Sequence, residues 1–386
     1  MKTLSVFFAW AAVLLAANAC NRGADAVESA PGAELMSKRQ VARMLSSLPI
    51  GSEQMSEVYE AVSASSGNGY DEEYMMADLL TVPGAGVGSD RALASKAAAA
   101  YGMPIKSLIE DYLAARIPAS TKAGAAEVED YLESLKSSGM QIYWPFSELW
   151  DGESLPLITY DPGDGSESNY AYVISSAGGG YEVVDSVFVD ENLARKRPVW
   201  VINQNDDSHC TPLSSLLIRP KSVSGEESEG KYNLYIKDIT MLRNYDSWFA
   251  GASEFHIWSG GVDGFYASTE EELRNYNPTV TDFVVVVKRY EVGIRKAFNA
   301  LLVSDFSEQL EKLAFLVVED DGGTQTNWKC SATVKVKSKS YGFDVNLPLN
   351  THDDVVWRGQ LSAGYFPKGK SIEGRFGDVK ITFALE

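Results

Sequence analysis

Residues 331–339 read Ser-Ala-Thr-Val-Lys-Val-Lys-Ser-Lys, and this stretch decides the fold class. Apolar and polar side chains alternate almost strictly along it, which is the period of a β-strand with one buried and one solvated face. Ala332, Val334 and Val336 should therefore face a core, while the lysines between them stay in water. The pattern predicts an antiparallel sheet.

Short runs rich in β-branched and aromatic residues surround this strand, and Gly, Pro, Asp and Ser separate them. They lie at 141–146, 155–160, 170–174, 181–189, 199–203, 213–218, 233–242, 254–258, 282–292, 313–318, 330–337, 342–347, 355–361 and 378–385. Regular spacing of this kind predicts a sandwich or a barrel. Because an acidic loop at 222–231 divides the runs, we expect a β-rich unit at 139–232 and a β-sandwich domain at 233–386, for which a C2-like arrangement is one option.

Before Gly139 the apolar residues follow a helical period. In MSKRQVARMLSSL (36–48) they stand at positions i, i+3, i+4 and i+7 of an amphipathic helix. Further helices are expected over 52–65, 72–80, 92–101, 104–116, 123–137 and, as insertions, 268–275 and 305–313. The region 36–138 should thus be helical and the whole chain α+β. Since the period changes near Gly139, the helical region and the β-rich remainder should be separable there.

The first twenty residues have the pattern of a bacterial lipoprotein export signal. A single lysine precedes an apolar run from Leu4 to Ala17, which is too short to span a membrane. The run ends in Ala17-Asn18-Ala19-Cys20, so we expect removal of residues 1–19 and acylation of Cys20 with palmitate-like chains. A secreted protein cut at an A-x-A-like site is the alternative. The small, polar residues 20–35 are typical of a flexible tether.

The 386 residues are 45% hydrophobic and 11% aromatic and carry a net charge of −19. The apolar content excludes wholesale disorder. An acidic surface repels phosphate, so nucleic acid is not an expected partner and membrane contact should come from the lipid anchor alone. Once Cys20 is acylated, Cys210 and Cys330 remain, and in an oxidising envelope they form one disulfide or stay as two buried thiols.

Acidic loops are the candidate metal sites. Glu319-Asp320-Asp321-Gly322-Gly323 follows an apolar run, and His352-Asp353-Asp354 precedes another. Carboxylates from two neighbouring strand ends suit one hard cation. The sequence therefore predicts calcium as a cofactor at Asp320, Asp321, Asp353 and Asp354, with solvated turn residues as the alternative.

Motifs for catalysis are weak. The three histidines, His209, His256 and His352, belong to no H-E-x-x-H pattern. Residues 364–371 fit the phosphate-loop pattern, but a Gly-broken stretch at 372–377 and then a strand follow where a helix is required. Trp248, Trp258 and Trp328 flank polar loops where a glycan could stack, and packing into the core is the alternative.

The cysteine box, the acidic chain and the phrases at 142–146 (IYWPF) and 198–203 (PVWVIN) resemble uncharacterised lipoproteins of Bacteroidota-type Gram-negative bacteria. This resemblance implies attachment to the outer membrane, facing the periplasm or the cell surface, and it carries no catalytic residue. The leading expectation is a non-enzymatic, lipid-anchored protein that binds a glycan, another extracellular ligand or a partner protein. An exported hydrolase with its site in the β-rich region is the alternative.

Overall fold

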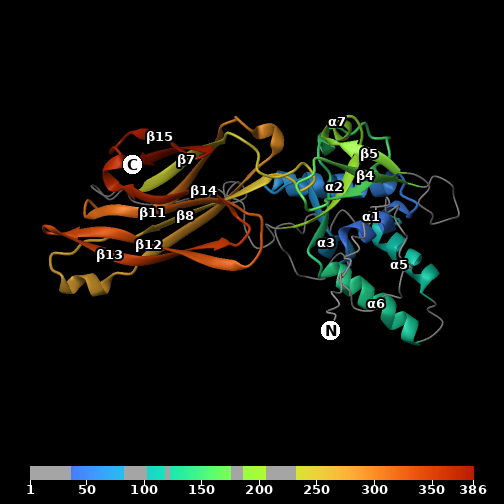
Figure 1. The fold of residues 1–386 in the computed structure, drawn as a ribbon, viewed down its shortest axis with the longest axis horizontal. Coiled ribbons are helices and arrows are strands. Elements are labelled where there is room, and N and C mark those ends of the chain that lie inside the picture. The colour runs from blue at the N-terminus through green and yellow to red at the C-terminus, as the bar shows by residue number, and fades with distance from the viewer. Residues whose placement is uncertain (1–35, 82–101, 118–121, 175–185, 206–231) are drawn as a thin grey trace, which may run out of the picture. The chain divides into compact units, whose positions relative to one another are not determined.

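The structure, a computed structural model, describes residues 36–81, 102–117, 122–174, 186–205 and 232–386. The chain is α+β as predicted, with helices concentrated before Met140 and mainly antiparallel sheets after it (Figure 1). Leu35–Glu386 form one compact unit. Among the helices of the described ranges, none has both the length and the apolar character needed to cross a bilayer. The predictions for residues 1–35, 92–101 and 213–218 fall outside these ranges.

The described part of 36–138 is mainly helical. Its helices are α1 (Lys38–Ser46), α2 (Ser52–Gly67), α3 (Met76–Leu80), α5 (Ile105–Arg116) and α6 (Lys122–Lys136). α1 begins with a capping box, in which the side chain of Ser37 accepts from the Gln40 N–H and the side chain of Gln40 accepts from the Ser37 N–H. The helix expected at 72–80 is instead strand β1 (Glu73–Met75) followed by α3. Pairing of β1 with β2 overrides the local helical pattern.

A six-stranded sheet accompanies these helices, with the strand order β1-β2-β6-β3-β4-β5. Its further strands are β2 (Met140–Tyr143), β3 (Leu157–Tyr160), β4 (Ser168–Val173), β5 (Ser186–Asp190) and β6 (Val199–Gln204), and the short helix α7 (Glu191–Ala194) joins β5 to β6. Neighbouring strands are antiparallel except β3 and β6, which are parallel.

The helices and this sheet share one core. One buried cluster contains Leu45 of α1, Val58 of α2, Trp144, which follows β2, and Trp200 of β6. Trp144 and Trp200 are 1% and 0% exposed, and their rings lie 6.0 Å apart. Because helices and strands bury each other's apolar side chains, the structure argues against the predicted separation at Gly139.

Two antiparallel sheets form a sandwich-like unit over 232–386 (Figure 1). The smaller sheet has the order β10-β7-β16-β15 and consists of β7 (Leu234–Met241), β10 (Lys296–Val303), β15 (Ser371–Phe376) and β16 (Val379–Leu385). The larger has the order β13-β12-β11-β8-β9, and β14 also pairs with β11. Its strands are β8 (Ser253–Gly261), β9 (Thr279–Val287), β11 (Leu310–Glu319), β12 (Gln325–Val336), β13 (Lys339–Asn350) and β14 (Asp354–Ser362).

The core of the sandwich confirms the alternation in residues 331–339. In β12, Ala332, Val334 and Val336 are 0%, 0% and 2% exposed, and the lysines beside them are exposed. They join Phe255 of β8 and Phe383 of β16 in one cluster that draws on both sheets. Strand β12 therefore has one buried and one solvated face, as the period of two requires.

Some elements differ from the sequence predictions. Strands β10 and β15 were not expected, and the helix expected at 305–313 is in fact the approach to β11 and its first residues. The expected helical insertion at 268–275 is the 3₁₀ helix η3 (Glu271–Asn275), and further 3₁₀ turns are η2 (Ser147–Leu149), η4 (Arg289–Glu291) and η5 (Ala363–Tyr365). The phosphate-loop pattern at 364–371 leads into β15, so it lacks the helix that phosphate binding needs.

The segment between β7 and β8 packs into the N-terminal sheet. Trp248 and Phe249 are both 0% exposed, and they join Leu157 of β3 and Val201 of β6 in a buried cluster. The indole N–H of Trp248 donates to the carbonyl of Glu167 at 2.9 Å. A short connecting segment thus buries two large aromatic side chains among residues that lie far away in sequence.

Candidate functional site

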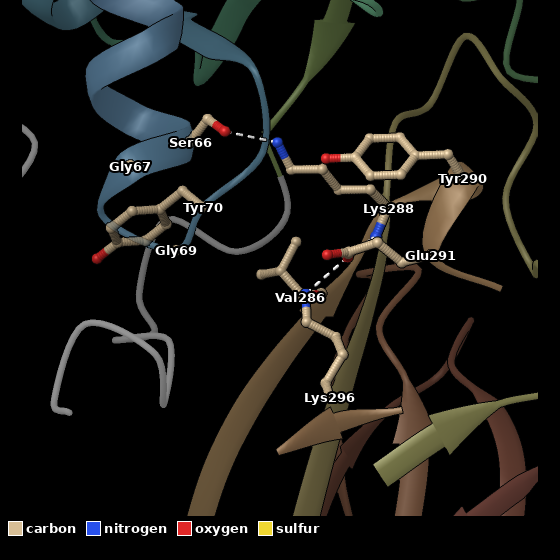
Figure 2. Close-up of a pocket in the computed structure, with 9 residues that line it drawn as sticks. All are labelled: Ser66, Gly67, Gly69, Tyr70, Val286, Lys288, Tyr290, Glu291 and Lys296. Atoms are coloured by element: carbon tan, nitrogen blue, oxygen red, sulfur yellow. Dashed lines mark hydrogen bonds and ion pairs between the residues drawn. The ribbon is translucent and has the colours of Figure 1, made fainter. Parts of the chain in front are cut away.

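A cavity of about 230 Å³ lies where the end of α2 meets the turn between β9 and β10 (Figure 2). It is lined by Ser66, Gly67, Gly69, Tyr70, Val286, Lys288, Tyr290, Glu291 and Lys296. The volume is below the roughly 300–1,000 Å³ of sites for drug-sized molecules. A single small ligand unit is therefore the size of occupant that it fits.

The cavity wall from α2 depends on a tight turn. The helix ends at Gly67, and Gly69 takes a φ of 91°, a left-handed conformation that glycine adopts without steric cost. The backbone N–H of Tyr70 then donates back to the carbonyl of Ser65 at 3.2 Å. The turn places Ser66 and Tyr70 on the cavity.

The opposite wall follows the end of β9. The valine run of β9 stops at Val287, and η4 turns the chain, with the backbone N–H of Lys288 donating to Glu291 Oε2 at 2.9 Å. Lys296, the first residue of β10, donates from Nζ to the same Glu291 oxygen at 2.6 Å and to the carbonyl of Val286 at 2.8 Å. Two cationic side chains thereby line the cavity against one carboxylate.

Lys288 is the buried charge of the cavity. It is 8% exposed, and its Nζ donates to Ser66 Oγ at 2.6 Å and to the carboxylate of Glu72 (Figure 2 shows the Ser66 contact). Burial by itself would lower the pKa of Lys288, but the carboxylates of Asp71 and Glu72 outweigh it and raise the pKa. The ammonium group therefore stays charged inside the protein.

The lining favours a small polar ligand with an anionic group. In the described part of the chain, the hydrogen bonds of Lys288 and Lys296 account for two of the three donors that each ammonium group has. Tyr290 is 50% exposed at the cavity and offers an aromatic face. Charged donors beside a tyrosine ring suit an acidic sugar, which combines a carboxylate with an apolar ring face.

The structure brings the predicted calcium residues Asp320 and Asp353 together. Asn350 links them, because its backbone N–H donates to Asp353 Oδ2 at 2.6 Å and its Nδ2 donates to Asp320 Oδ1 at 3.0 Å. Asp320 Oδ1 also accepts from the Gly322 N–H, and Oδ2 lies 3.1 Å from His256 Nε2. A cation at Asp320 would have to displace one of these donors.

Asp321 and Asp354, the other two predicted calcium residues, are exposed at the same end of the sheet. Asp354 stands opposite Glu319 in the β11–β14 pair. Partial burial, followed by the charges of Asp246, Asp354, Asp353 and Asp320, raises the pKa of Asp321 to about 6. The two acidic loops therefore converge, and calcium binding by them remains a prediction.

The histidines give little support to a hydrolase. His209 lies outside the described residues and His352 is exposed, while His256 is 7% exposed and stacks on Trp258 with ring centroids 6.1 Å apart. His256 and Asp320 form an acid–base pair, but they line neither the cavity above nor a second one of about 70 Å³ beside Trp150.

Other predicted site residues are placed as follows. Cys330 is a free, half-buried thiol that donates to the carbonyl of Val345 at 3.5 Å, and burial raises its pKa to about 11. Cys20 and Cys210 lie outside the described residues. Trp248 is buried in a core and offers no face for sugar stacking, whereas Trp258 and Trp328 are partly buried against the sandwich core.

Sequence reasoning missed the cavity. Ser66 and Lys288 are 222 positions apart, so only the fold brings them together. The one local signal is the abrupt change at 284–291, where four valines give way to Lys-Arg-Tyr-Glu.

No family model matches the chain, and neither a curated protein nor a solved structure matches it.

Proposed function

We propose that this protein is a non-enzymatic binding protein of the bacterial envelope, anchored to the outer membrane by acyl chains on Cys20, and that it binds a small acidic ligand in the Lys288 cavity. The single observation that supports ligand binding is the buried Lys288 ammonium at a cavity of about 230 Å³. The proposal of a lipid anchor rests on residues 17–20 and on the export signal that precedes them. An acidic sugar unit of an extracellular glycan is the ligand class that we favour.

The charge pattern of the cavity supports this ligand class. The chain as a whole carries −19 and repels anions at long range. In the lining, Lys288 and Lys296 face the carboxylate of Glu291, while Glu72 pairs with Lys288 beside the cavity, so the site offers charged N–H donors without a net positive charge. A ligand with a single carboxylate and several hydroxyl groups can pair with the lysines and reach the neutral lining groups.

Titration calorimetry with glucuronate and with glucose tests the proposal. Glucuronate should bind and glucose should bind more weakly, because only the former supplies a carboxylate. Lys296→Met should weaken glucuronate binding about tenfold, in line with the loss of one charged hydrogen bond. Tyr290→Ala should weaken both sugars by removing the aromatic face.

Lys335→Met is the matched control, because Lys335 is an exposed lysine of β12 outside the cavity lining. Its binding should equal that of the unaltered protein. Equal affinity for the two sugars, or glucuronate binding that survives both Lys296→Met and Tyr290→Ala, would show that this cavity is not the binding site.

A further inference from the structure

A second group of acidic side chains lies at the end of the sandwich that carries the acidic loops. Asp246 lies between β7 and β8, Glu254 is the second residue of β8, and Glu319 is the last residue of β11. β8 and β11 pair antiparallel, and Glu319 stands opposite Phe255, the neighbour of Glu254. One carboxylate oxygen from each of the three acids lies within 4.8 Å of the others. Across the described residues, this is the one set of three acidic, histidine or cysteine side chains with such spacing.

These carboxylates are withdrawn from water. Glu319 is 0% exposed and Glu254 is 5% exposed. Asp246 is half-buried, and its Oδ2 atom is buried. Three acids this close cannot all be ionised in a buried place unless a proton or a cation balances their charge.

Asp71 provides an independent observation from a distant part of the chain. It is 4% exposed, and its Oδ2 accepts a hydrogen bond from the Ala252 N–H at 2.9 Å, which holds the carboxylate beside the start of β8. Its Oδ1 is buried and receives no hydrogen bond from the described residues, and the same is true of Asp246 Oδ2. Ala252, which Asp71 contacts, stands two residues before Glu254 in the chain. Two buried carboxylate oxygens without a donor are unfavourable unless a ligand satisfies them.

The basic groups around this cluster have acidic partners of their own. Lys288 pairs with Glu72, and His256 lies 3.1 Å from Asp320. Arg289 donates to the backbone carbonyl of Asp246 and lies 3.4 Å from Glu191. Each of these three basic side chains is therefore engaged by an acidic group outside the cluster.

The donor set selects a hard cation. All the atoms offered are carboxylate oxygens, which suit calcium or magnesium, whereas zinc prefers histidine and cysteine. Calcium accepts six to eight oxygen ligands in a flexible geometry, whereas magnesium needs near-ideal octahedral geometry and keeps several waters, so a site built from protein carboxylates suits calcium better. We propose that Asp246, Glu254 and Glu319 bind one calcium ion beside the buried carboxylate of Asp71. This site differs from the predicted loop site at 320, 321, 353 and 354.

The test uses the purified full chain after treatment with chelator. Calorimetric titration with calcium chloride should show one ion bound per chain, and magnesium should bind more weakly. Glu319→Gln keeps the shape of the side chain and removes its charge, so it should weaken calcium binding at least about tenfold. The paired substitution Asp321→Asn with Asp353→Asn removes two charges from the loop residues and should leave one ion bound.

Thermal unfolding separates loss of the site from loss of the fold. In chelator, Glu319→Gln should melt above the unaltered protein, because one repelling charge is gone. In calcium the order should reverse, because only the unaltered protein gains stability from the ion. A Glu319→Gln variant that fails to fold is replaced by Asp246→Asn, for which the same reversal is expected.

Three results would overturn the proposal. One is a calcium-free protein whose melting temperature does not change when calcium is added and which shows no heat of binding in the titration. Another is calcium binding that survives both Glu319→Gln and Asp246→Asn. The third is binding abolished by the loop substitutions Asp321→Asn and Asp353→Asn but kept in Glu319→Gln, which would move the ion to the loop residues.

Discussion

At the scale of single residues, Glu57 shows how burial changes a titration. It is 1% exposed on α2, its Oε2 accepts the Ile105 N–H at 2.8 Å, and the Tyr74 hydroxyl donates to Oε1 at 3.4 Å. Burial outweighs these hydrogen bonds and raises the pKa of Glu57 from 4.5 to about 7. The carboxyl group thus holds the start of α5 to α2 and does so with its proton bound over much of the acidic range.

The raised pKa of Glu57 predicts a pH-dependent stability. Between about pH 4.5 and 7 the folded chain keeps a proton that the unfolded chain has released, so the free energy of unfolding falls as pH rises through this window. The stabilisation is fully present below pH 4.5 and amounts to about 3 kcal/mol at most. Glu57→Gln should remove this dependence, measured as the difference between the two proteins in urea unfolding at pH 4.5, 5.5, 6.5 and 7.5.

Glu60→Gln is the control for this measurement, since Glu60 is exposed on the same helix. Its pH profile should follow that of the unaltered protein. Profiles of Glu57→Gln and the unaltered protein that run parallel from pH 4.5 to 7.5 would contradict the raised pKa.

At the scale of elements, the segment between β7 and β8 contains Trp248, a side chain that should contribute strongly to the free energy of unfolding. Trp248 is 0% exposed, its ring lies 4.0 Å from that of Phe249, and its N–H is bonded to Glu167. Trp248→Ala should lower the free energy of unfolding by about 3–5 kcal/mol, because it removes a buried aromatic ring and leaves a carbonyl without its donor. Denaturant unfolding measures the change.

Tyr266→Ala is the comparison, because Tyr266 is 73% exposed and its loss should change stability by no more than about 0.5 kcal/mol. A loss below about 1 kcal/mol in Trp248→Ala would mean that the segment contributes little to the packed state.

The elements that sequence could predict are those whose period is long and regular. The alternation around Val334 and the amphipathic face of α1 carry enough residues to define a strand and a helix. β1 could not be predicted, because its three residues lie within a longer helical pattern and only pairing with β2 makes them a strand. β10 reads KAFNALLV, a sequence that suits a helix as well as a strand, and its partner β7 decides between them.

The candidate sites were predictable only in part. Asp320 and Asp353 could be grouped because acidic turns at strand ends often meet. Glu254 and Glu319 have a signal in the sequence, because each stands directly at the end of an apolar run. The structure buries both side chains, whereas a turn residue would stay in water. Asp71 carries no such signal, because its partner Ala252 comes from the far part of the chain, and Lys288 carries only the break after the four valines at 284–287.

At the scale of the whole molecule, three separate arrangements would act together. The anchor would hold the chain at the membrane, the Lys288 cavity would bind its ligand, and a calcium ion at Glu319 would stabilise the end of the sandwich. Asp71 and Glu72 are adjacent in sequence, and Glu72 pairs with Lys288 while Asp71 contacts the start of β8. Occupation of the cation site should therefore influence the cavity through this one turn.

Membrane attachment is the prediction that concerns the whole molecule most directly. Cys20→Ser should release the protein from the membrane fraction, because two or more acyl chains hold a protein stably and the cysteine is their attachment point. The acidic chain, with a net charge of −19, gains no electrostatic attraction to anionic headgroups. Sedimentation of membranes before and after a salt wash measures release, and the melting temperature of Cys20→Ser should equal that of the unaltered protein. Cys330→Ser is the matched control and should stay with the membranes. A Cys20→Ser protein that still sediments after the wash would show that another part of the chain holds it there.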